Sequence, residues 1–287
     1  MGNEQQSFLI LHFSFHIPHF SFLIVVYLEE KLIKSLICEL AANISINSEF
    51  FILHFNWEGH APRAGQFFMI KHLRGSVFLP RPISVFEYNG GQRLLKFLIA
   101  KRGKGTEELS QLQTGEKVQL TGPLGNTWAD FLPESGKTAL VGGSVGLAPL
   151  SALMAEKPDY FFHFFAGFRQ GFRDKEEENA VLGFAVNAKR LVIAAEDGRN
   201  ALNGRITDFL FEPEKYDVLF ACGPSAMLST VKKKCEQKRV PCFLSLESRL
   251  ACGVGACLGC TIKTINGNRR CCADGPIFPA GEIVFDE

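Results

Sequence analysis

The spacing of apolar residues divides the chain into regions of different predicted structure. Between residues 31 and 133, short apolar runs alternate with stretches rich in glycine, proline and asparagine. These runs occupy residues 36–44, 50–55, 67–71, 83–86, 94–100 and 117–121. Asn89-Gly90-Gly91 separates two of them, and such a turn typically joins the strands of a β-hairpin. Several short strands at this spacing predict a small antiparallel β-barrel.

From residue 134 to residue 240 the pattern changes, because apolar runs alternate with longer helix-like stretches. Residues 138–141 lead into glycines and a predicted helix, and residues 160–166, 191–195 and 218–222 are runs of the same kind. This alternation is typical of βαβ units that build a parallel sheet. The sequence therefore predicts a mixed β and α/β fold: an antiparallel barrel, a parallel-sheet domain, and a small cysteine-rich domain at residues 241–287.

An apolar extension at residues 1–30 precedes the predicted barrel. Residues 8–28 carry no formal charge and are about as long as the roughly 20 residues that span a bilayer. Pro18 and the serines and histidines of this stretch are costly in lipid. A cleavable signal peptide is disfavoured, because Glu4 precedes the apolar run and no lysine or arginine does. Two interpretations stay open: a non-essential extension, such as one from a start codon assigned too far upstream, or a membrane anchor.

The amino-acid composition excludes some classes of protein and indicates a metal site. Of the 287 residues, 46% are hydrophobic and 21% are charged, which is the profile of a packed protein. Lys and Arg number 31 and Asp and Glu number 30, so the net charge of +1 excludes a globally basic nucleic-acid-binding protein. The 27 phenylalanines are consistent with a core filled by Phe in place of Leu or Val. Five of the nine cysteines lie between residues 252 and 272, and this clustering indicates a metal site in a reducing compartment, the cytoplasm.

The clustered cysteines have the spacing of an iron–sulfur site. Cys252, Cys257 and Cys260 follow the pattern C-x4-C-x2-C, and the adjacent Cys271 and Cys272 come next. This is the plant-type [2Fe–2S] spacing. The intervening glycines let the backbone wrap closely around a cluster and present N–H donors to it. A zinc knuckle is the alternative, but zinc sites usually have C-x2-C pairs on both sides. Spacing alone does not choose between the two adjacent cysteines as the fourth ligand.

Two loops follow predicted strands of the parallel sheet and are candidate nucleotide-binding elements. The first loop contains Gly142, Gly143 and Gly146, and the second contains Cys222, Gly223 and Pro224. Backbone N–H groups and a helix N-terminus in such a loop can approach a pyrophosphate. Ligands of open parallel sheets bind at the carboxyl ends of the strands, where both loops are predicted to lie. A plain tight turn is the alternative for the first loop, because Ser144 interrupts its glycine pattern.

Two segments of the predicted barrel carry candidate phosphate-binding chemistry. The first is a run of four residues, Arg81, Pro82, Ile83 and Ser84. An arginine can bind a phosphate with two hydrogen bonds, and a serine can bond a ring heteroatom; a strand with a surface arginine is the alternative. The second segment begins with Leu98, Ile99 and Ala100 and continues to Gly105 and Thr106. Glycines at the start of a helix allow backbone N–H groups to approach and bind a pyrophosphate. The alternative for this segment is a solvated turn.

Taken in order, these motifs resemble the ferredoxin–NADP reductase superfamily. The cysteine segment, together with Cys272-Ala273-Asp274-Gly275-Pro276-Ile277-Phe278, is similar to that of the electron-transfer subunits of B-type class I dihydroorotate dehydrogenases. The resemblance covers residues 33–287 and implies an FAD-binding barrel at 31–133, an NAD-binding domain at 134–240 and a [2Fe-2S] domain at 241–287. It implies that FAD is bound by residues 81–84, 98–100 and 105–106. It also implies that the fourth cluster ligand is Cys272.

The resemblance further implies an electron relay in de novo pyrimidine biosynthesis. NAD(H), FAD and the [2Fe-2S] cluster would connect to FMN in a catalytic subunit that oxidises dihydroorotate, in a heterotetramer of two plus two subunits. Two alternatives stay open: a reductase subunit of an oxygenase-, sulfide- or ferredoxin-linked complex, and a non-enzymatic zinc scaffold. Cys252 favours the dihydroorotate-linked family, because some sulfide- and transhydrogenase-type relatives carry Asp there. Arg169 is a candidate ligand of a 2′-phosphate, and a surface arginine is the alternative. Glu247 is a candidate residue facing the flavin, and an exposed strand residue is the alternative.

Overall fold

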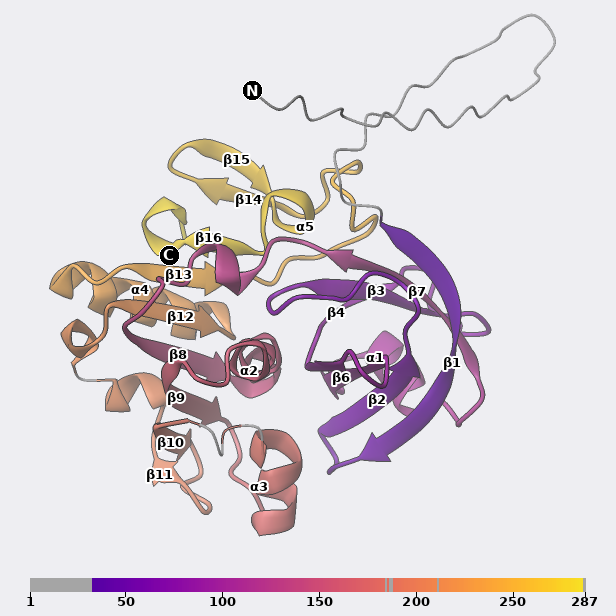
Figure 1. Cartoon of the computed structure of the whole chain (residues 1–287), viewed down its shortest axis with the longest axis horizontal. Coiled ribbons are helices and arrows are strands. Elements are labelled where there is room, and N and C mark those ends of the chain that lie inside the picture. Colours follow the sequence, from indigo (N-terminus) through magenta and orange to yellow (C-terminus); the bar gives the residue numbers. More distant parts are fainter. Residues whose placement is uncertain (1–32, 184, 186–187, 211, 286–287) are drawn as a thin grey trace, which may run out of the picture. The chain divides into compact units, whose positions relative to one another are not determined.

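The computed structural model describes residues 33–183, 185, 188–210 and 212–285, which form two large sheets and a small hairpin (Figure 1). The interpretations of residues 8–28 lie outside the described residues. Within the described part of the chain, no helix is long and apolar enough to cross a membrane.

The first sheet is antiparallel and curls into a barrel-like shape. Its strand order is β4-β3-β7-β1-β2-β6-β5. Strands β4 and β5, at the two edges of this sheet, are consecutive in the chain. The two residues between them bond to opposite edges of the sheet: Val85 N–H donates to Gln66 O and Phe86 N–H donates to Lys96 O, both at 3.0 Å. The prediction of an antiparallel barrel is confirmed, as is the hairpin, which joins β5 to β6. The strands are β1 Lys34–Ser45, β2 Phe50–Asn56, β3 Phe67–His72, β4 Arg81–Ser84, β5 Glu87–Asn89, β6 Leu94–Ala100 and β7 Lys117–Leu124.

Aromatic side chains fill the inside of this barrel. Phe68 contacts both Trp57 and Phe97 edge to face, with ring centroids 4.8 and 5.6 Å apart. Phe55 meets Phe97 in the same way at 6.1 Å. All four rings are fully buried, so each gives the barrel a large apolar area and a preferred ring geometry. Several of the abundant phenylalanines are thus part of the core of the barrel.

The second sheet has the order β11-β10-β9-β8-β12-β13-β16, and its five central strands are parallel. β8 is the first of these strands in the chain, with β9 on one side and β12 on the other, so the strand order reverses there. The loops after β8 and β12 therefore lie together at the carboxyl edge, as predicted. The strands are β8 Lys137–Gly143, β9 Phe161–Phe168, β10 Arg190–Ala195, β11 Leu202–Asn203, β12 Val218–Cys222, β13 Cys242–Ser245 and β16 Ile277–Pro279.

Helix α2 (Leu147–Glu156) lies between the two sheets, and α4 (Ser225–Lys238) packs on the other face of the parallel sheet (Figure 1). One apolar cluster contains α2 together with barrel residues such as Phe50 and Phe86. Ser151 Oγ–H donates to Phe86 O at 2.9 Å, and Trp128 Nε1–H donates to Pro149 O at 3.1 Å. The barrel and the parallel sheet therefore share a core. The other helices are α1 Lys104–Ser110 and α3 Lys175–Leu182, and short 3-10 turns cover Trp128–Asp130, Ser144–Gly146, Ile206–Phe209, Pro213–Lys215 and Ala280–Glu282.

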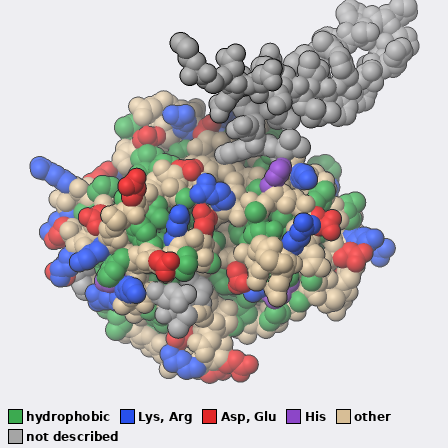
Figure 2. Space-filling view, viewed as in Figure 1, with side chains coloured by type: hydrophobic (Ala, Val, Ile, Leu, Met, Phe, Trp, Pro, Cys, Tyr) green, Lys and Arg blue, Asp and Glu red, His purple; other side chains and the backbone are tan. Residues whose placement is uncertain are grey.

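The cysteine-rich segment leaves and rejoins the parallel sheet. It departs after β13 and returns as β16, which pairs antiparallel with β13. Between them lie the hairpin β14 (Thr261–Thr264) and β15 (Gly267–Arg270) and the short helix α5 (Cys271–Asp274). On the face shown in Figure 2, Lys and Arg side chains are interspersed with Asp and Glu.

Candidate functional site

A pocket of about 220 Å³ lies where the barrel, the parallel sheet and the cysteine-rich segment meet. The barrel contributes strands β4 and β6 and the start of α1, the parallel sheet contributes the loops after β8 and β12, and the third wall follows β13. Many of the residues predicted for cofactor binding line this one pocket: Pro82, Ile83, Ser84, Leu98, Ile99, Ala100, Thr106, Gly146 and Cys222. Of the remaining predicted cofactor residues, Arg81, Gly105 and Gly223 are the chain neighbours of lining residues, and Gly142, Gly143 and Pro224 lie within four positions of one.

Arg81 and Gly105 are in close contact on the barrel side. A Cβ on Gly105 would lie 2.8 Å from Arg81 Cδ, so the absence of a side chain there lets the arginine lie against the start of α1. Arg81 Nη2–H donates to Leu79 O at 3.0 Å. Its Nε is buried and, among the described residues, has no hydrogen-bond partner. A buried guanidinium N–H without a partner is costly, so this position is chemically suited to an anionic oxygen such as that of a phosphate.

The two loops of the parallel sheet touch each other through their backbones. A Cβ on Gly146 would lie 2.2 Å from the carbonyl oxygen of Cys222, and a Cβ on Gly143 would lie 2.8 Å from both Met227 Sδ and Pro224 Cδ. Both glycines are therefore required by close approach. Together the loops form a glycine-lined edge at the carboxyl ends of the strands, at the N-terminal side of α2.

Glu247 and Cys222 line the pocket, and burial raises the pKa of both side chains. Glu247 follows β13 and lines the pocket. Nearby protein atoms partly remove its carboxyl from water, and this desolvation raises the pKa of the carboxyl above 4.5. The positive charge of the nearby Arg102 acts in the opposite direction and lowers that pKa. Burial raises the pKa of the Cys222 thiol far above its usual range, and the charge of Glu247 adds to this. Cys222 is thus a neutral thiol in the wall. Glu247 does not belong to a strand; it lies at the pocket.

The four predicted cluster cysteines are arranged as two pairs. Cys260 and Cys272 have their sulfur atoms 3.2 Å apart. Desolvation tends to raise the pKa of Cys252, but hydrogen bonds from Cys257 and from backbone N–H groups outweigh it and lower that pKa to about 6. Within the described ranges, no three His, Cys, Asp or Glu side chains gather around one point to hold a single metal ion. Paired thiols match a binuclear cluster, in which each iron takes two thiolates.

The backbone around these thiols is shaped for close approach to sulfur. Gly253 and Gly255 have φ of +73° and +78°, and Gly255 N–H donates to Cys272 Sγ at 3.1 Å. A Cβ on Gly253 would meet Met69 of β3 at 2.7 Å, so this loop also packs against the barrel. Donors of this kind stabilise negative charge on sulfur.

The adjacent residues Cys271 and Cys272 point in different directions. Cys272 Sγ faces Cys260, whereas Cys271 Sγ–H donates to Leu246 O at 3.2 Å, and Cys271 lines the pocket. Asp274 fixes the turn that carries them by accepting hydrogen bonds from Arg270 N–H at 2.7 Å and from its Nη2–H at 2.9 Å. One residue of the pair therefore faces the pocket and the other faces the cysteine cluster.

Some pocket residues were not predicted from the sequence. Phe67, Arg102, Leu246 and Leu250 line it as well. The position of Leu246 and Leu250 could have been inferred, because the chain that leaves a parallel strand must cross the carboxyl edge of the sheet before it reaches Cys252. The contribution of Phe67 depends on the fold of the barrel and has no local signal. Arg169, next to the end of β9, is exposed.

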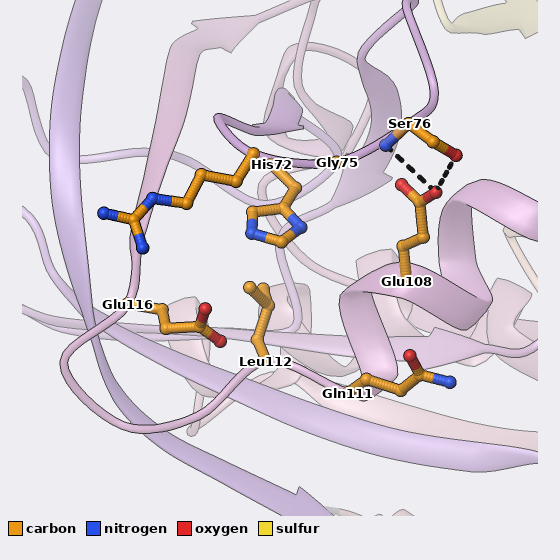
Figure 3. A pocket seen from close by; sticks show the side chains of 8 residues that line it. His72, Gly75, Ser76, Glu108, Gln111, Leu112 and Glu116 are labelled. Atoms are coloured by element: carbon orange, nitrogen blue, oxygen red, sulfur yellow. Dashed lines mark hydrogen bonds between the residues drawn. The ribbon is translucent and has the colours of Figure 1, made fainter.

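A second pocket, of about 280 Å³, lies on the barrel between the end of β3 and helix α1 (Figure 3). In this view Glu108 reaches from α1 toward Ser76, whose N–H donates to Glu108 Oε1 at 3.1 Å and whose hydroxyl donates to the same oxygen. The Ser76 hydroxyl is the main cause of the lowered pKa of Glu108. These bonds tie the β3–β4 loop to α1. None of the predicted site residues lines this pocket.

Comparisons with known proteins agree with this geometry. The family model described as the iron–sulfur cluster binding domain of dihydroorotate dehydrogenase B matches residues 247–284. The dihydroorotate dehydrogenase B (NAD(+)) electron transfer subunit of Clostridium acetobutylicum is 38% identical over 245 residues, which cover 85% of this chain and 95% of that one. Its counterpart from Caldanaerobacter subterraneus is 35% identical over 249 residues, covering 85% and 96%.

Solved structures share the fold. The structure of an NADH-dependent reduced ferredoxin–NADP oxidoreductase superposes with a TM-score of 0.71 at 24% identity and covers 86% of this chain and 89% of that one. A ferredoxin–NADP+ reductase from Neisseria gonorrhoeae gives a TM-score of 0.59 at 16% identity, covering 71% and 92%. The fold is thus that of the ferredoxin–NADP reductases. With relatives at this identity over most of its length, the chain belongs to the family of dihydroorotate dehydrogenase B electron transfer subunits.

Proposed function

We propose that the chain is the electron transfer subunit of an NAD-dependent dihydroorotate dehydrogenase. It connects NAD to a partner catalytic subunit that contains FMN and oxidises dihydroorotate in pyrimidine biosynthesis, with electrons flowing toward NAD+. When bound, FAD exchanges an electron pair with the nicotinamide and single electrons with the iron–sulfur cluster. The observation that carries the proposal is the pocket, because its walls come from the barrel, the nucleotide loops and the segment that leads to the cluster cysteines.

The barrel would hold FAD through residues 81–84, 98–100 and 105–106. The buried Nε of Arg81 supports this role, since a phosphate oxygen would supply the partner that it lacks among the described residues. Ser84, Ile99 and Ala100 would line the flavin ring, because they line this pocket. The domain division proposed with this role is FAD-binding at 31–133, NAD-binding at 134–240 and [2Fe-2S]-binding at 241–287.

The thiolates of Cys252, Cys257, Cys260 and Cys272 would hold the cluster. Their arrangement as two pairs supports a binuclear cluster, in which each iron takes two thiolates. The choice of Cys272 is supported by its contact with Cys260, and Cys271 is directed away, toward Leu246 O. Thiolate ligands of this kind fit the reducing cytoplasm, where we propose that the protein works.

The loops after β8 and β12 would hold NAD(H) against the flavin. Gly142, Gly143 and Gly146 supply a backbone edge at the N-terminal side of α2, which favours a pyrophosphate, and Cys222, Gly223 and Pro224 close the same edge. Cys257, one of the four proposed cluster ligands, is exposed, and the neighbouring Leu258 is 62% exposed. An exposed cluster loop supports electron exchange with a partner protein, in a proposed heterotetramer of two plus two subunits.

Anaerobic co-expression with an FMN-containing dihydroorotate dehydrogenase subunit tests the proposal. We expect a coloured complex with one FAD and one [2Fe-2S] cluster for each copy of this chain, in which dihydroorotate reduces the flavins and the cluster and NAD+ reoxidises them. The matched control is a complex with Cys260→Ser, which should lose the cluster and the transfer between NAD and FMN. A colourless, zinc-containing protein, or a coloured one that neither binds the partner nor exchanges electrons with it, would contradict the proposal.

A further inference from the structure

Arg102 bridges the barrel and the first nucleotide loop. It lies between β6 and α1, and its Nη2 donates to Ser144 Oγ at 2.9 Å and lies 2.8 Å from Glu49 Oε1. Its backbone N–H donates to Thr106 Oγ1 at 2.9 Å. The arginine is therefore anchored on the barrel at both its backbone and its guanidinium, and the guanidinium also donates to Ser144 of the first nucleotide loop.

Ser144 is in a conformation that ordinary residues avoid. Its φ is +53°, in the left-handed region, where a side chain makes an unfavourable contact with the backbone. It is the first residue of the turn Ser144–Gly146 at the carboxyl end of β8. The hydroxyl, however, accepts a charge-assisted hydrogen bond from Arg102, which is stronger than a neutral one. A serine in this position thus gains a contact with the barrel that a glycine could not make.

This bridge lies at the mouth of the pocket. Arg102 lines the pocket together with Val145 and Gly146, the two residues that follow Ser144. The barrel strands and the strands of the parallel sheet belong to different sheets, so no shared hydrogen-bond ladder sets the distance between the flavin side and the nucleotide loop. Individual contacts between the two sides set it, and Arg102 provides one of them beside the pocket.

We propose that Arg102 is a positioning residue for the nucleotide loop: through Ser144 it holds residues 144–146 at a fixed place relative to the flavin-binding barrel and so strengthens the binding of the pyridine dinucleotide. This inference rests on the proposed function, because it assumes that the loop binds NAD(H). Arg102 acts through Ser144 and does not take part in hydride transfer. Loss of one such hydrogen bond should weaken NADH binding about three- to tenfold.

The test compares Ser144→Ala and Arg102→Met with a matched control. Ser144→Ala keeps a Cβ in the left-handed conformation and removes only the hydroxyl, and Arg102→Met keeps most of the side-chain length. The control is Arg63→Met, because Arg63 also joins the barrel to the other sheet, through Glu156 Oε1 of α2 at 3.2 Å, but does not line the pocket. Stopped-flow reduction of the bound flavin by NADH, in the complete subunit under anaerobic conditions, gives an apparent Kd and a limiting rate.

We expect the apparent Kd for NADH to rise about three- to tenfold in Ser144→Ala and in Arg102→Met, with no further rise in the double variant, since both remove the same contact. Arg63→Met should keep the wild-type Kd. The electron paramagnetic resonance spectrum of the dithionite-reduced cluster should be the same in all variants.

An unchanged Kd in Ser144→Ala overturns the inference, even if Arg102→Met loses flavin. An equal rise of the Kd in Arg63→Met also overturns it, because any contact between the sheets would then suffice, and so does an additive double variant. The proposed function fails separately: in that case NADH does not reduce the flavin of the wild-type subunit at all.

Discussion

Gly146 is the position at which the two nucleotide loops approach each other most closely. A Cβ there would lie 2.2 Å from Cys222 O and 2.5 Å from the carbonyl carbon of Cys222, whereas ordinary contact begins at 3.4 Å. In Gly146→Ala the loops must therefore separate by about 1.2 Å. The atoms that are contacted belong to the backbone, so no side-chain rotation relieves the clash. Overpacking of this kind costs about 1–3 kcal/mol.

Two measurements follow from that separation. In a chain of this size, about 1–3 kcal/mol lowers the Tm by about 2–12 °C, which thermal unfolding of the flavin-loaded subunit can detect. NADH should also bind about tenfold more weakly or worse, because a displacement of about 1 Å at a binding site has large effects. The control is Gly281→Ala, since a Cβ on Gly281 would have no atom within 4 Å. If Gly146→Ala keeps both the wild-type Tm and the wild-type affinity for NADH, the reasoning from close loop contact is refuted.

Three further predictions concern the same pocket and the cluster. Cys272→Ser should lose the [2Fe-2S] spectrum and most of the bound iron while Cys271→Ser keeps both; iron analysis with the reversed result would overturn the ligand choice. Gly105→Ala should weaken FAD retention, because its Cβ would lie 2.8 Å from Arg81 Cδ and displace the guanidinium; equal FAD content after gel filtration would contradict this. Desolvation raises the pKa of Glu247 above 4.5, so its ionisation opposes folding as the pH rises past 4.5. In the apoprotein, Glu247→Gln should raise the Tm at pH 7 and leave it unchanged at pH 4, and an equal effect at both pH values would exclude this cause.

The longer strands of the barrel and the strands β8, β9, β10 and β12 of the parallel sheet could be predicted because their signals are local. The buried strand β9 is an example: Phe162 and Phe164 belong to the core on one face of the sheet and Phe165 to the core on the other. A strand that is covered on both faces is apolar at consecutive positions, and the run at residues 160–166 has that property except at His163. The loops after β8 and β12 could be placed for a similar reason, since parallel strands end at the same edge.

Contacts between segments that are distant in the chain could not be predicted in the same way. Asn126, at the end of the barrel, donates through Nδ2 to Ile277 O at 2.8 Å and accepts from Ile277 N–H at 3.0 Å. These residues are 151 positions apart, and neither has a local signal that names the other. The contact of Arg102 is of the same kind, because its bond to Ser144 depends on how the two sheets pack.

The proposed choice of Cys272 over Cys271 rests on geometry that the spacing of the cysteines does not contain. Both cysteines satisfy the ligand spacing within one residue, but neighbouring residues of a helical turn point about 100° apart, so only one of them can face Cys260. The hydrogen bonds from Arg270 to Asp274 fix the turn so that this residue is Cys272. Cys271 then faces the pocket and donates to Leu246 O. A single peptide bond therefore joins a proposed cluster ligand to the wall of the proposed flavin pocket, which places the two cofactor sites side by side, as one-electron transfer between them requires.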